Sequence, residues 1–294
     1  MASSRKVIGI TTGDAAGIGP EVARGALSSG RLDAAFDYRL IGDPDAALAG
    51  RPTRASAEAA FAALEEAVRL AQSGEISAVV TGPVSKARMH EVGFEFPGQT
   101  EFFAARWKVR DYAMCLTGGA LTVALVTAHI PLRSVADALT AEEIVRTGRL
   151  LEKFSALRLG RNARLAVAGL NPHAGESGDL GREEIEIIAP AVALLRESAL
   201  AEWSGPYSPD TVFHRVVAGE FDGVLCMYHD QGLIPLKLHA FDSGANVTLG
   251  LPHPRTSPDH GTAFDIAGRG VARPDSMIAA IQLAAEIVRK TTTA

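Results

Sequence analysis

The stretch that decides the fold is FDGVLCMYHDQGLIPLKLHAFDSGANVTLGLPHPRTSPDHGT, residues 221–262. Its glycines and prolines exclude one long helix. Residues 223–228 form a short, wholly apolar run, typical of a strand buried on both faces of a parallel sheet. The run ends in His229-Asp230-Gln231-Gly232, and residues 246–250 read as a second short strand followed by a loop rich in Pro, His and Arg. Ligands of open α/β sheets bind just beyond such strand ends, so we expect a functional site here, with a merely polar surface loop as the alternative.

Working outward, apolar strands alternate with helical patterns along the chain. Strands are predicted at 6–10, 38–43 and 78–81, and an Ala-rich helix is predicted at 57–73. Further on, we expect a helix over 183–200, a loop over 205–211 and a final helix over about 276–291. This alternation predicts the α/β class with a largely parallel sheet.

Length, composition and charge limit the classes of function to expect. The chain has 294 residues, of which 47% are apolar, and a formal net charge of −5. One large domain or two fused domains are therefore expected. No basic block is present, which argues against nucleic acid as a partner. No apolar run reaches 18 residues, so we expect no membrane association and a cytoplasmic protein. Cys115 and Cys226 lie in apolar contexts and read as buried thiols.

Three predicted strands end in a turn that carries a histidine. The strand at 121–127 is followed by His129, the strand at 165–170 by His173, and the strand at 223–228 by His229. A lone histidine is more often structural than a ligand. Three neutral imidazoles at equivalent strand ends, however, can hold a divalent ion and leave positions open for substrate oxygens.

Two further segments allow two interpretations each. The loop GDAAGIGPE (13–21) matches neither nucleotide-binding fingerprint; its glycines form a loose phosphate cradle or simply allow close packing of strand and helix. Residues 98–101 precede a helix whose free amides could accept an anion. Alternatively, Thr100 is only the N-cap of that helix.

These motifs resemble the 4-hydroxythreonine-4-phosphate dehydrogenase family of vitamin B6 synthesis and its catabolic relatives. The resemblance runs nearly end to end. It rests on GDAAGIGPE (13–21), TGPVSK (81–86), PGQTEF (97–102), TAHIPL (127–132), GLNPHAGE (169–176), SPDT (208–211), MYHDQGLIPLK (227–237) and NVTLGLPHPRTSPDHGTA (246–263).

The resemblance implies a two-domain α/β/α fold like that of isocitrate and isopropylmalate dehydrogenases, with the active-site cleft between the domains. We expect residues 1–95 plus 265–294 to form the first domain and residues 96–264 to form the second, which carries the metal and the dimer contacts. It also implies a homodimer whose site is shared across the interface, a small anionic substrate, NAD as cofactor, and one divalent ion (Zn, Mg, Co or Mn).

The family's functional positions fall on identifiable residues. Its metal ligands correspond to His129, His173 and His229, one of them contributed by the partner subunit. Its substrate contacts correspond to Thr100, Lys237, Asn246 and Arg255, and its acids near the site correspond to Asp210 and Asp230. Gln99 stands where the biosynthetic enzymes have a histidine, which can carry a positive charge beside a phosphate as glutamine cannot.

The expected function is metal-assisted, NAD-dependent oxidation of a secondary alcohol in a hydroxy acid, followed by decarboxylation of the β-keto acid. Lys237, then Asp230, are the candidate bases, and Asp210 is a further catalytic candidate. A catabolic paralogue is the first alternative; it would act on erythronate or threonate 4-phosphate or on an aromatic cis-dihydrodiol carboxylate. The alternatives from other classes are a metal-dependent hydrolase that uses the same histidines and a binding protein without activity.

Overall fold

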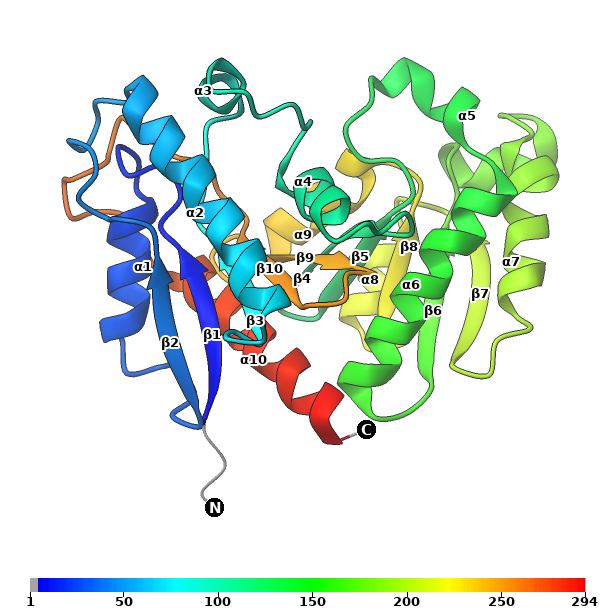
Figure 1. The fold of residues 1–294 in the computed structure, drawn as a ribbon. Helices are drawn as coiled ribbons and strands as arrows, with labels where there is room; N and C mark the ends of the chain where they lie inside the picture. The colour runs from blue at the N-terminus through cyan, green and yellow to red at the C-terminus, as the bar shows by residue number, and fades with distance from the viewer. Residues whose placement is uncertain (1–4, 294) are drawn as a thin grey trace. The chain divides into compact units, whose positions relative to one another are not determined.

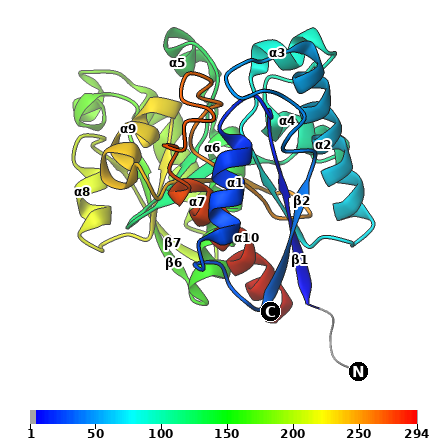
Figure 2. The same ribbon diagram turned by 90° about the vertical axis from the view of Figure 1, so that its left-hand side faces the viewer.

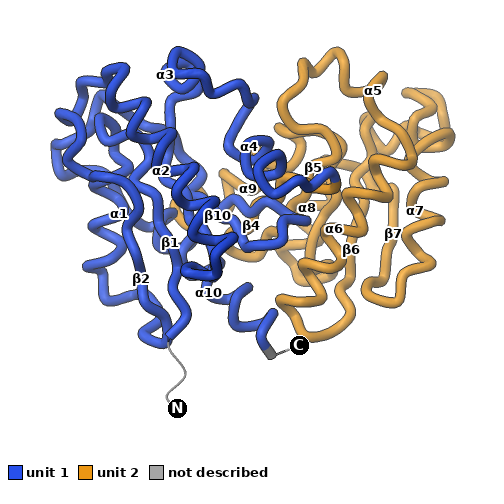
Figure 3. The backbone as a smooth tube through the Cα atoms, viewed as in Figure 1, with its two compact units in different colours: residues 1–110, 245–294 blue, residues 111–244 orange. Residues whose placement is uncertain are grey.

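The computed structural model describes residues 5–293 and divides the chain into two compact units (Figure 3). Unit 1 takes residues 1–110 and 245–294, and unit 2 takes residues 111–244. The expected domains were 1–95 plus 265–294 and 96–264, so segments 96–110 and 245–264 belong here to the unit that contains the N-terminal strands. Gln99, Thr100 and Arg255 therefore lie in unit 1, and the three strand-end histidines lie in unit 2.

Five sheet strands of the described chain lie in unit 1 (Figure 1): β1 (Lys6–Thr11), β2 (Phe36–Ile41), β3 (Ala78–Thr81), β9 (Ala245–Leu249) and β10 (Arg255–Pro258). Their order is β2-β1-β3-β10-β9. The first four in this order are parallel, and β9 is antiparallel to β10. The fully buried residues of β3 agree with the continuous apolar pattern from which the strand was predicted.

The helices of unit 1 are α1 (Gly19–Ser28), α2 (Arg54–Gln72), α3 (Lys86–Glu91), α4 (Gln99–Arg106) and α10 (Asp275–Thr293). Strands β1 and β2 lie between α1 and α2 (Figure 2). Thr53 is the N-cap of helix α2: its hydroxyl accepts from the Ser56 amide while the Ser56 hydroxyl accepts from the Thr53 amide. Phe94, Phe102 and Phe103 are buried against the alanine face of α2, and this packing fixes α4, which begins with Gln99 and Thr100.

Five sheet strands of the described chain lie in unit 2: β4 (Ala113–Gly118), β5 (Leu121–Leu125), β6 (Ala163–Ala168), β7 (Ala201–Tyr207) and β8 (Gly223–Cys226). Their order is β4-β5-β8-β6-β7. Only β4 is antiparallel to its neighbour; the pairs β5–β8, β8–β6 and β6–β7 are parallel. The carboxyl ends of β5, β6 and β8 therefore share one edge of this sheet, and each of the three histidines follows one of these ends.

The helical segments of unit 2 are η1 (Leu132–Ser134), α5 (Val135–Ala138), α6 (Ala141–Leu159), η2 (Pro172–Gly178), η3 (Glu184–Ile188), α7 (Ala189–Leu195), α8 (Val212–Val217) and α9 (His229–Ala240). Helices α6 and α7 cover one face of the sheet, and α8 and α9 cover the other (Figure 1). Leu233 and Leu236 of α9 join Val123, Leu125 and Val224 in the core.

The predicted α/β class is confirmed, but several local predictions were wrong. No helix was predicted over residues 229–240, which form α9 despite Pro235. Its leucines and isoleucine lie on both the buried and the exposed side of the helix, so the sequence lacks the amphipathic period that would reveal it. The loop expected from residue 205 begins later, because β7 runs to Tyr207 and an edge strand tolerates Pro206. The helix expected over 183–200 ends at Leu195.

Two corrections concern the site itself. Arg255, expected in a loop, is the first residue of β10 and is buried. Thr100 is not an N-cap, because Gly98 occupies that position and α4 begins at Gln99. Both corrections move a polar side chain from the surface into the packed interior of unit 1. Among residues 5–293 no helix combines the length and the apolar character needed to span a bilayer.

Candidate functional site

A pair of histidines lies where β5 and β8 end. The pairing of these parallel strands continues past their last residues, because the amides of Val126 and Thr127 donate to the carbonyls of Cys226 and Met227 at 2.9 and 3.1 Å. The Thr127 hydroxyl also donates to the Met227 carbonyl at 2.7 Å. This extended ladder brings His129 and His229 side by side, with ring centroids 5.7 Å apart.

The buried amide of Gln231 fixes the start of α9. Its Oε1 accepts from the Met227 amide at 2.7 Å, and its Nε2 donates to the Gly169 carbonyl at 2.6 Å. One side chain thus links the ends of β8 and β6. Sequence reasoning assigned no role to Gln231; the only signal was a glutamine between a buried strand and a glycine.

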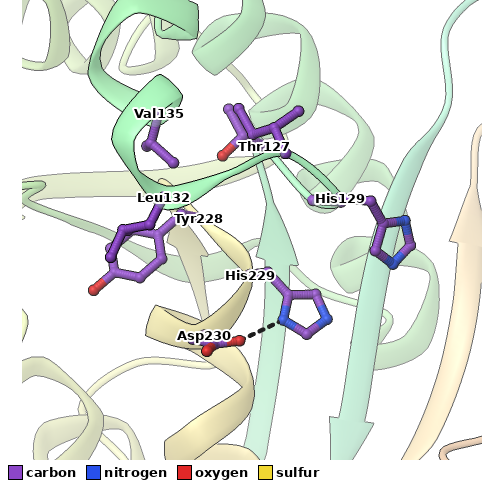
Figure 4. Close-up of a pocket in the computed structure, with 9 residues that line it drawn as sticks. Thr127, His129, Leu132, Val135, Tyr228, His229 and Asp230 are labelled. Atoms are coloured by element: carbon purple, nitrogen blue, oxygen red, sulfur yellow. Dashed lines mark hydrogen bonds and ion pairs between the residues drawn. The ribbon is translucent and has the colours of Figure 1, made fainter.

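The histidine pair lines a cavity of about 230 Å³ in unit 2. Figure 4 shows the His229 ring between the Asp230 carboxylate and His129. His229 Nδ1 lies 2.7 Å from Asp230 Oδ1, which leaves Nε2 for another partner. The cavity is lined by Thr127, Ala128, His129, Ile130, Leu132, Val135, Tyr228, His229 and Asp230.

The histidine pair fits part of a metal site. Imidazole nitrogens lie about 2.0–2.1 Å from a bound Zn²⁺, so two rings that share one ion have centroids roughly 5–6 Å apart. The observed 5.7 Å agrees with this arrangement. Within the described part of the chain, however, no three His, Cys, Asp or Glu side chains are grouped so that they could hold a metal. His173 is therefore not brought together with His129 and His229 in a complete site.

His173 follows β6 in η2, where its side chain is 62% exposed and its Nδ1 lies 2.7 Å from Glu176 Oε1. Asp210 is exposed after β7 and accepts from the Ser208 hydroxyl. Lys237 lies two turns into α9 from His229 and is half-buried. All of these residues belong to unit 2.

Unit 1 contains a buried guanidinium. Arg255 is 3% exposed, and its Nη atoms donate to Thr81 Oγ1 at 2.6 Å, Gln99 Oε1 at 3.1 Å and Thr248 Oγ1 at 3.3 Å. Thr100 Oγ1 lies at 3.5 Å. Sequence reasoning missed Thr81 and Thr248, whose only signal was a threonine within an otherwise apolar strand.

No carboxylate lies within ion-pair distance of this guanidinium among residues 5–293, and its direct acceptors are neutral. Burial lowers the pKa of Arg255 to about 10, while Glu101 acts in the opposite direction. A buried charge is costly unless it is paired, and Glu101 acts on this one only from beyond ion-pair distance, so the guanidinium could also receive an anion.

Gln99 links the Arg255 guanidinium to the backbone at Gly82 and so helps to orient it. Its Oε1 accepts from Arg255, and its Nε2 donates to the Gly82 carbonyl at 3.1 Å. Asn246 lies on β9, two residues before Thr248 and on the same face of the strand. The side-chain oxygen of Asn246 and the Nε of Arg255 are buried without a hydrogen-bond partner in the described structure, as expected for groups that a ligand would satisfy.

The chain is similar to known proteins over most of its length. The family model of the "Pyridoxal phosphate biosynthetic protein PdxA" matches residues 25–284. A 4-hydroxythreonine-4-phosphate dehydrogenase of Caulobacter vibrioides is 52% identical over 82% of this chain and 74% of its own length.

Among solved structures, a 4-hydroxythreonine-4-phosphate dehydrogenase of Klebsiella pneumoniae superposes with a TM-score of 0.82 at 38% identity and covers 96% of this chain and 99% of its own. A terephthalate 1,2-cis-dihydrodiol dehydrogenase of Burkholderia xenovorans gives 0.69 at 27% identity, covering 96% and 98%. Isocitrate dehydrogenase of Methylococcus capsulatus gives 0.53 at 16% identity, covering 97% and 99%, which confirms the expected fold likeness alone.

Proposed function

The chain belongs to the PdxA family of pyridoxal phosphate biosynthetic proteins, and from this membership we propose that it is an NAD-dependent, divalent-metal-dependent 4-hydroxythreonine-4-phosphate dehydrogenase. Its named relatives support an oxidoreductase. The observation that carries the proposal is the pair His129 and His229, 5.7 Å apart at the ends of two parallel strands.

The proposed reaction needs a divalent ion and NAD, and side chains of this chain supply the rest of its chemistry. A bound divalent ion would polarise the alcohol oxygen of the substrate, and NAD would accept the hydride. His129 and His229 would hold the ion, with His173 as the third ligand. Lys237 is the first candidate for the base that takes the alcohol proton. Asp230 comes second, because its carboxylate already faces His229 Nδ1. Asp210 remains a further catalytic candidate.

Arg255 is the proposed partner for the anionic part of the substrate. Its planar fork suits the oxygens of a phosphate or carboxylate, and Gln99, Thr100 and Asn246 provide neutral hydrogen-bonding groups beside it. Oxidation of the alcohol gives a ketone β to a carboxylate. Cleavage of the bond to that carboxylate then releases carbon dioxide, and the ketone oxygen takes up the electron pair.

We further propose that the working form is a homodimer. Helix α9 begins with His229 and exposes Ile234, Leu238 and Phe241 at helical spacing, with exposed fractions of 64, 88 and 71%. Such a stripe is unusual on a free surface. A second copy that covered this stripe would bind along the helix that begins with His229, whose pair with His129 lacks a third ligand in the described chain, so the partner's copy of the His173 turn is the proposed source of that ligand.

The test is an assay of purified protein with 4-phosphohydroxythreonine, NAD and Mn²⁺, Zn²⁺ or Mg²⁺, followed through the absorbance of reduced nicotinamide. His129→Ala should lower turnover by more than about 100-fold and remove bound metal. His214→Ala, an exposed histidine on α8 of the same unit, should change neither. Turnover without NAD would favour the metal-dependent hydrolase, and equal activity of His129→Ala would refute the metal assignment.

Gln99 favours a second candidate within the same chemistry. A neutral amide beside Arg255 supplies less positive charge than the family's histidine, which suits a catabolic paralogue that oxidises another acid. The substrate panel therefore includes erythronate and threonate 4-phosphates and an aromatic cis-dihydrodiol carboxylate. If the phosphoester is the substrate, Gln99→His should raise its kcat/KM several-fold; if the dihydrodiol is preferred, the same change should lower its kcat/KM. A preference for any of these substrates that Gln99→His leaves unchanged would exclude Gln99 as the specificity determinant.

A further inference from the structure

The turn that carries His173 has an unusual backbone. Five consecutive residues, 173–177, have positive φ angles between 43° and 80°. Only Gly175 among them is a glycine, and L-residues rarely adopt this left-handed conformation in succession. A run of outliers persists only when the surrounding structure imposes it, and such runs cluster at functional sites.

A buried carboxylate imposes this turn. Glu184 is 3% exposed, and its Oε1 accepts from the amides of Leu170 and Asn171 at 2.7 and 2.8 Å. Its Oε2 accepts from Asn171 Nδ2 at 3.0 Å. A Cβ on Gly175 would lie 2.6 Å from Glu184 Oε2, so the turn is packed directly onto this carboxylate. The end of β6 and the start of the turn are thereby fixed.

The left-handed turn places Glu176 against His173. Glu176 Oε1 lies 2.7 Å from His173 Nδ1, although the two side chains are 53 and 62% exposed. An ordinary exposed ion pair contributes little to stability, so stability alone does not account for the strained turn. A carboxylate at Nδ1 favours the neutral tautomer with its proton on Nδ1, and the lone pair then lies on Nε2.

His229 shows the same arrangement, with Asp230 Oδ1 at 2.7 Å from its Nδ1. Two of the three strand-end histidines therefore have a carboxylate from a nearby residue of the chain on the same ring nitrogen. Carboxylates that hold a histidine in this way orient it for metal binding through the other nitrogen.

We propose that Glu176 is a positioning residue that holds His173 in the tautomer whose Nε2 can bind a divalent cation, on a turn that Glu184 keeps in the left-handed conformation. This inference rests on the proposed metal-dependent function. It assigns a role to a residue that touches neither the substrate nor the metal.

The direct test is the tautomer of His173 in metal-free protein. Protein labelled with ¹⁵N-histidine is measured by two-bond ¹⁵N–¹H NMR at about pH 8, where free imidazole is neutral, and His173→Ala identifies the signal. The native protein should show His173 with its proton on Nδ1. Glu176→Ala should move the proton to Nε2, whereas Glu176→Gln, whose carbonyl can still accept from Nδ1, should preserve much of the native signal. An unchanged tautomer in Glu176→Ala would overturn the inference.

Zn²⁺ affinity supplies the second readout, measured by equilibrium dialysis of the full chain with Zn²⁺ alone. Glu176→Ala should weaken binding by about 10–100-fold, with partial recovery in Glu176→Gln. Glu186→Gln, a change of an exposed carboxylate on η3 that pairs with Arg182 instead of a histidine, should bind as the native protein does. Circular dichroism checks that each variant is folded.

Zn²⁺ binding by the two variants distinguishes a failure of the role of Glu176 from a failure of the metal-dependent function. Loss of Zn²⁺ binding in His173→Ala but not in Glu176→Ala would leave the metal-dependent function standing and overturn only the role of Glu176. Native Zn²⁺ binding in His173→Ala would remove His173 from the metal site, and with it both the assigned ligand set and this inference.

Discussion

At the scale of the residue, the most informative group is Arg255. Its guanidinium is buried among Thr81, Gln99 and Thr248 and has only neutral acceptors. Keeping a charge in the interior with only neutral acceptors costs folding free energy. On the proposed function, this cost is offset when an anionic substrate binds.

Arg255→Met tests this interpretation. The variant should have a free energy of unfolding within ~1–3 kcal/mol of native, because removal of a desolvated charge offsets the loss of its hydrogen bonds to Thr81, Gln99 and Thr248. Binding of an anionic substrate should weaken by about 2–5 kcal/mol. Thermal unfolding and the KM of the preferred substrate measure the two effects. A markedly destabilised variant with a native KM would show that Arg255 is a structural residue.

Burial also decides the chemistry of the two cysteines. Cys115 and Cys226 are both free and buried, as the sequence predicted. Burial raises the pKa of Cys115 to about 12 and raises the pKa of Cys226 as well. Neither thiol is therefore available as a thiolate for metal binding or nucleophilic chemistry at neutral pH.

At the scale of the element, Asp222 joins two strand beginnings in unit 2. It precedes β8, and its carboxylate accepts from the Arg164 amide of β6 at 2.7 Å and from the guanidinium groups of Arg161 and Arg164. Burial acts to raise the pKa of Asp222, but these hydrogen bonds outweigh it and hold the pKa well below the ordinary value of 3.8.

The lowered pKa of Asp222 predicts how the stability of the fold changes in acid. Because the folded chain binds this proton less readily than the unfolded chain, the Asp222 carboxylate stabilises the fold at neutral pH, and this contribution is lost as the pH falls below the ordinary value. Asp222→Asn should lower the free energy of unfolding by about 1–3 kcal/mol at neutral pH. Urea unfolding should show the deficit shrinking toward pH 3 to 2, roughly the range below the ordinary pKa.

The control is Asp45→Asn, which breaks an ion pair with Arg24 whose side chains are 52 and 75% exposed. It should leave stability within ~0.5 kcal/mol of native at every pH. A pH-independent deficit in Asp222→Asn would mean that packing at the strand beginnings, not charge, accounts for its contribution.

At the scale of the whole molecule, the apolar stripe on α9 links assembly to the site. Ile234, Leu238 and Phe241 are exposed in the single chain, and His229 begins the same helix. If a second copy covers this stripe, a change there should disturb the metal site without touching a histidine.

Leu238→Glu should convert a dimer into a folded monomer that retains less metal, because a charge buried at the interface is costly. Light scattering after size-exclusion chromatography gives the mass, circular dichroism the fold, and dialysis the metal content. Leu48→Glu, a matched change at a 70% exposed leucine in unit 1, should remain dimeric. A dimer in Leu238→Glu with native metal content would place the interface elsewhere.

The α/β class and the order of most strands and helices were determined by the sequence alone, which also supplied the segments in which the site is proposed. Buried parallel strands are apolar throughout, helices repeat with their own period, and a strand that ends in a histidine is a local feature. The prediction failed where local signals misled: α9 has apolar residues on its exposed side as well as its buried side, and Pro206 signalled a turn inside an edge strand.

Only the tertiary structure decided which of these residues meet. The parallel pairing of β5 and β8 brings His129 to His229, although they are far apart along the chain, and leaves His173 on a separate turn. Likewise, β10 pairs with β3 of unit 1, and this pairing buries Arg255 beside Gln99 and Thr81. Sequence patterns record each strand's own burial, whereas proximity between distant residues depends on strand order and register, which no single segment encodes.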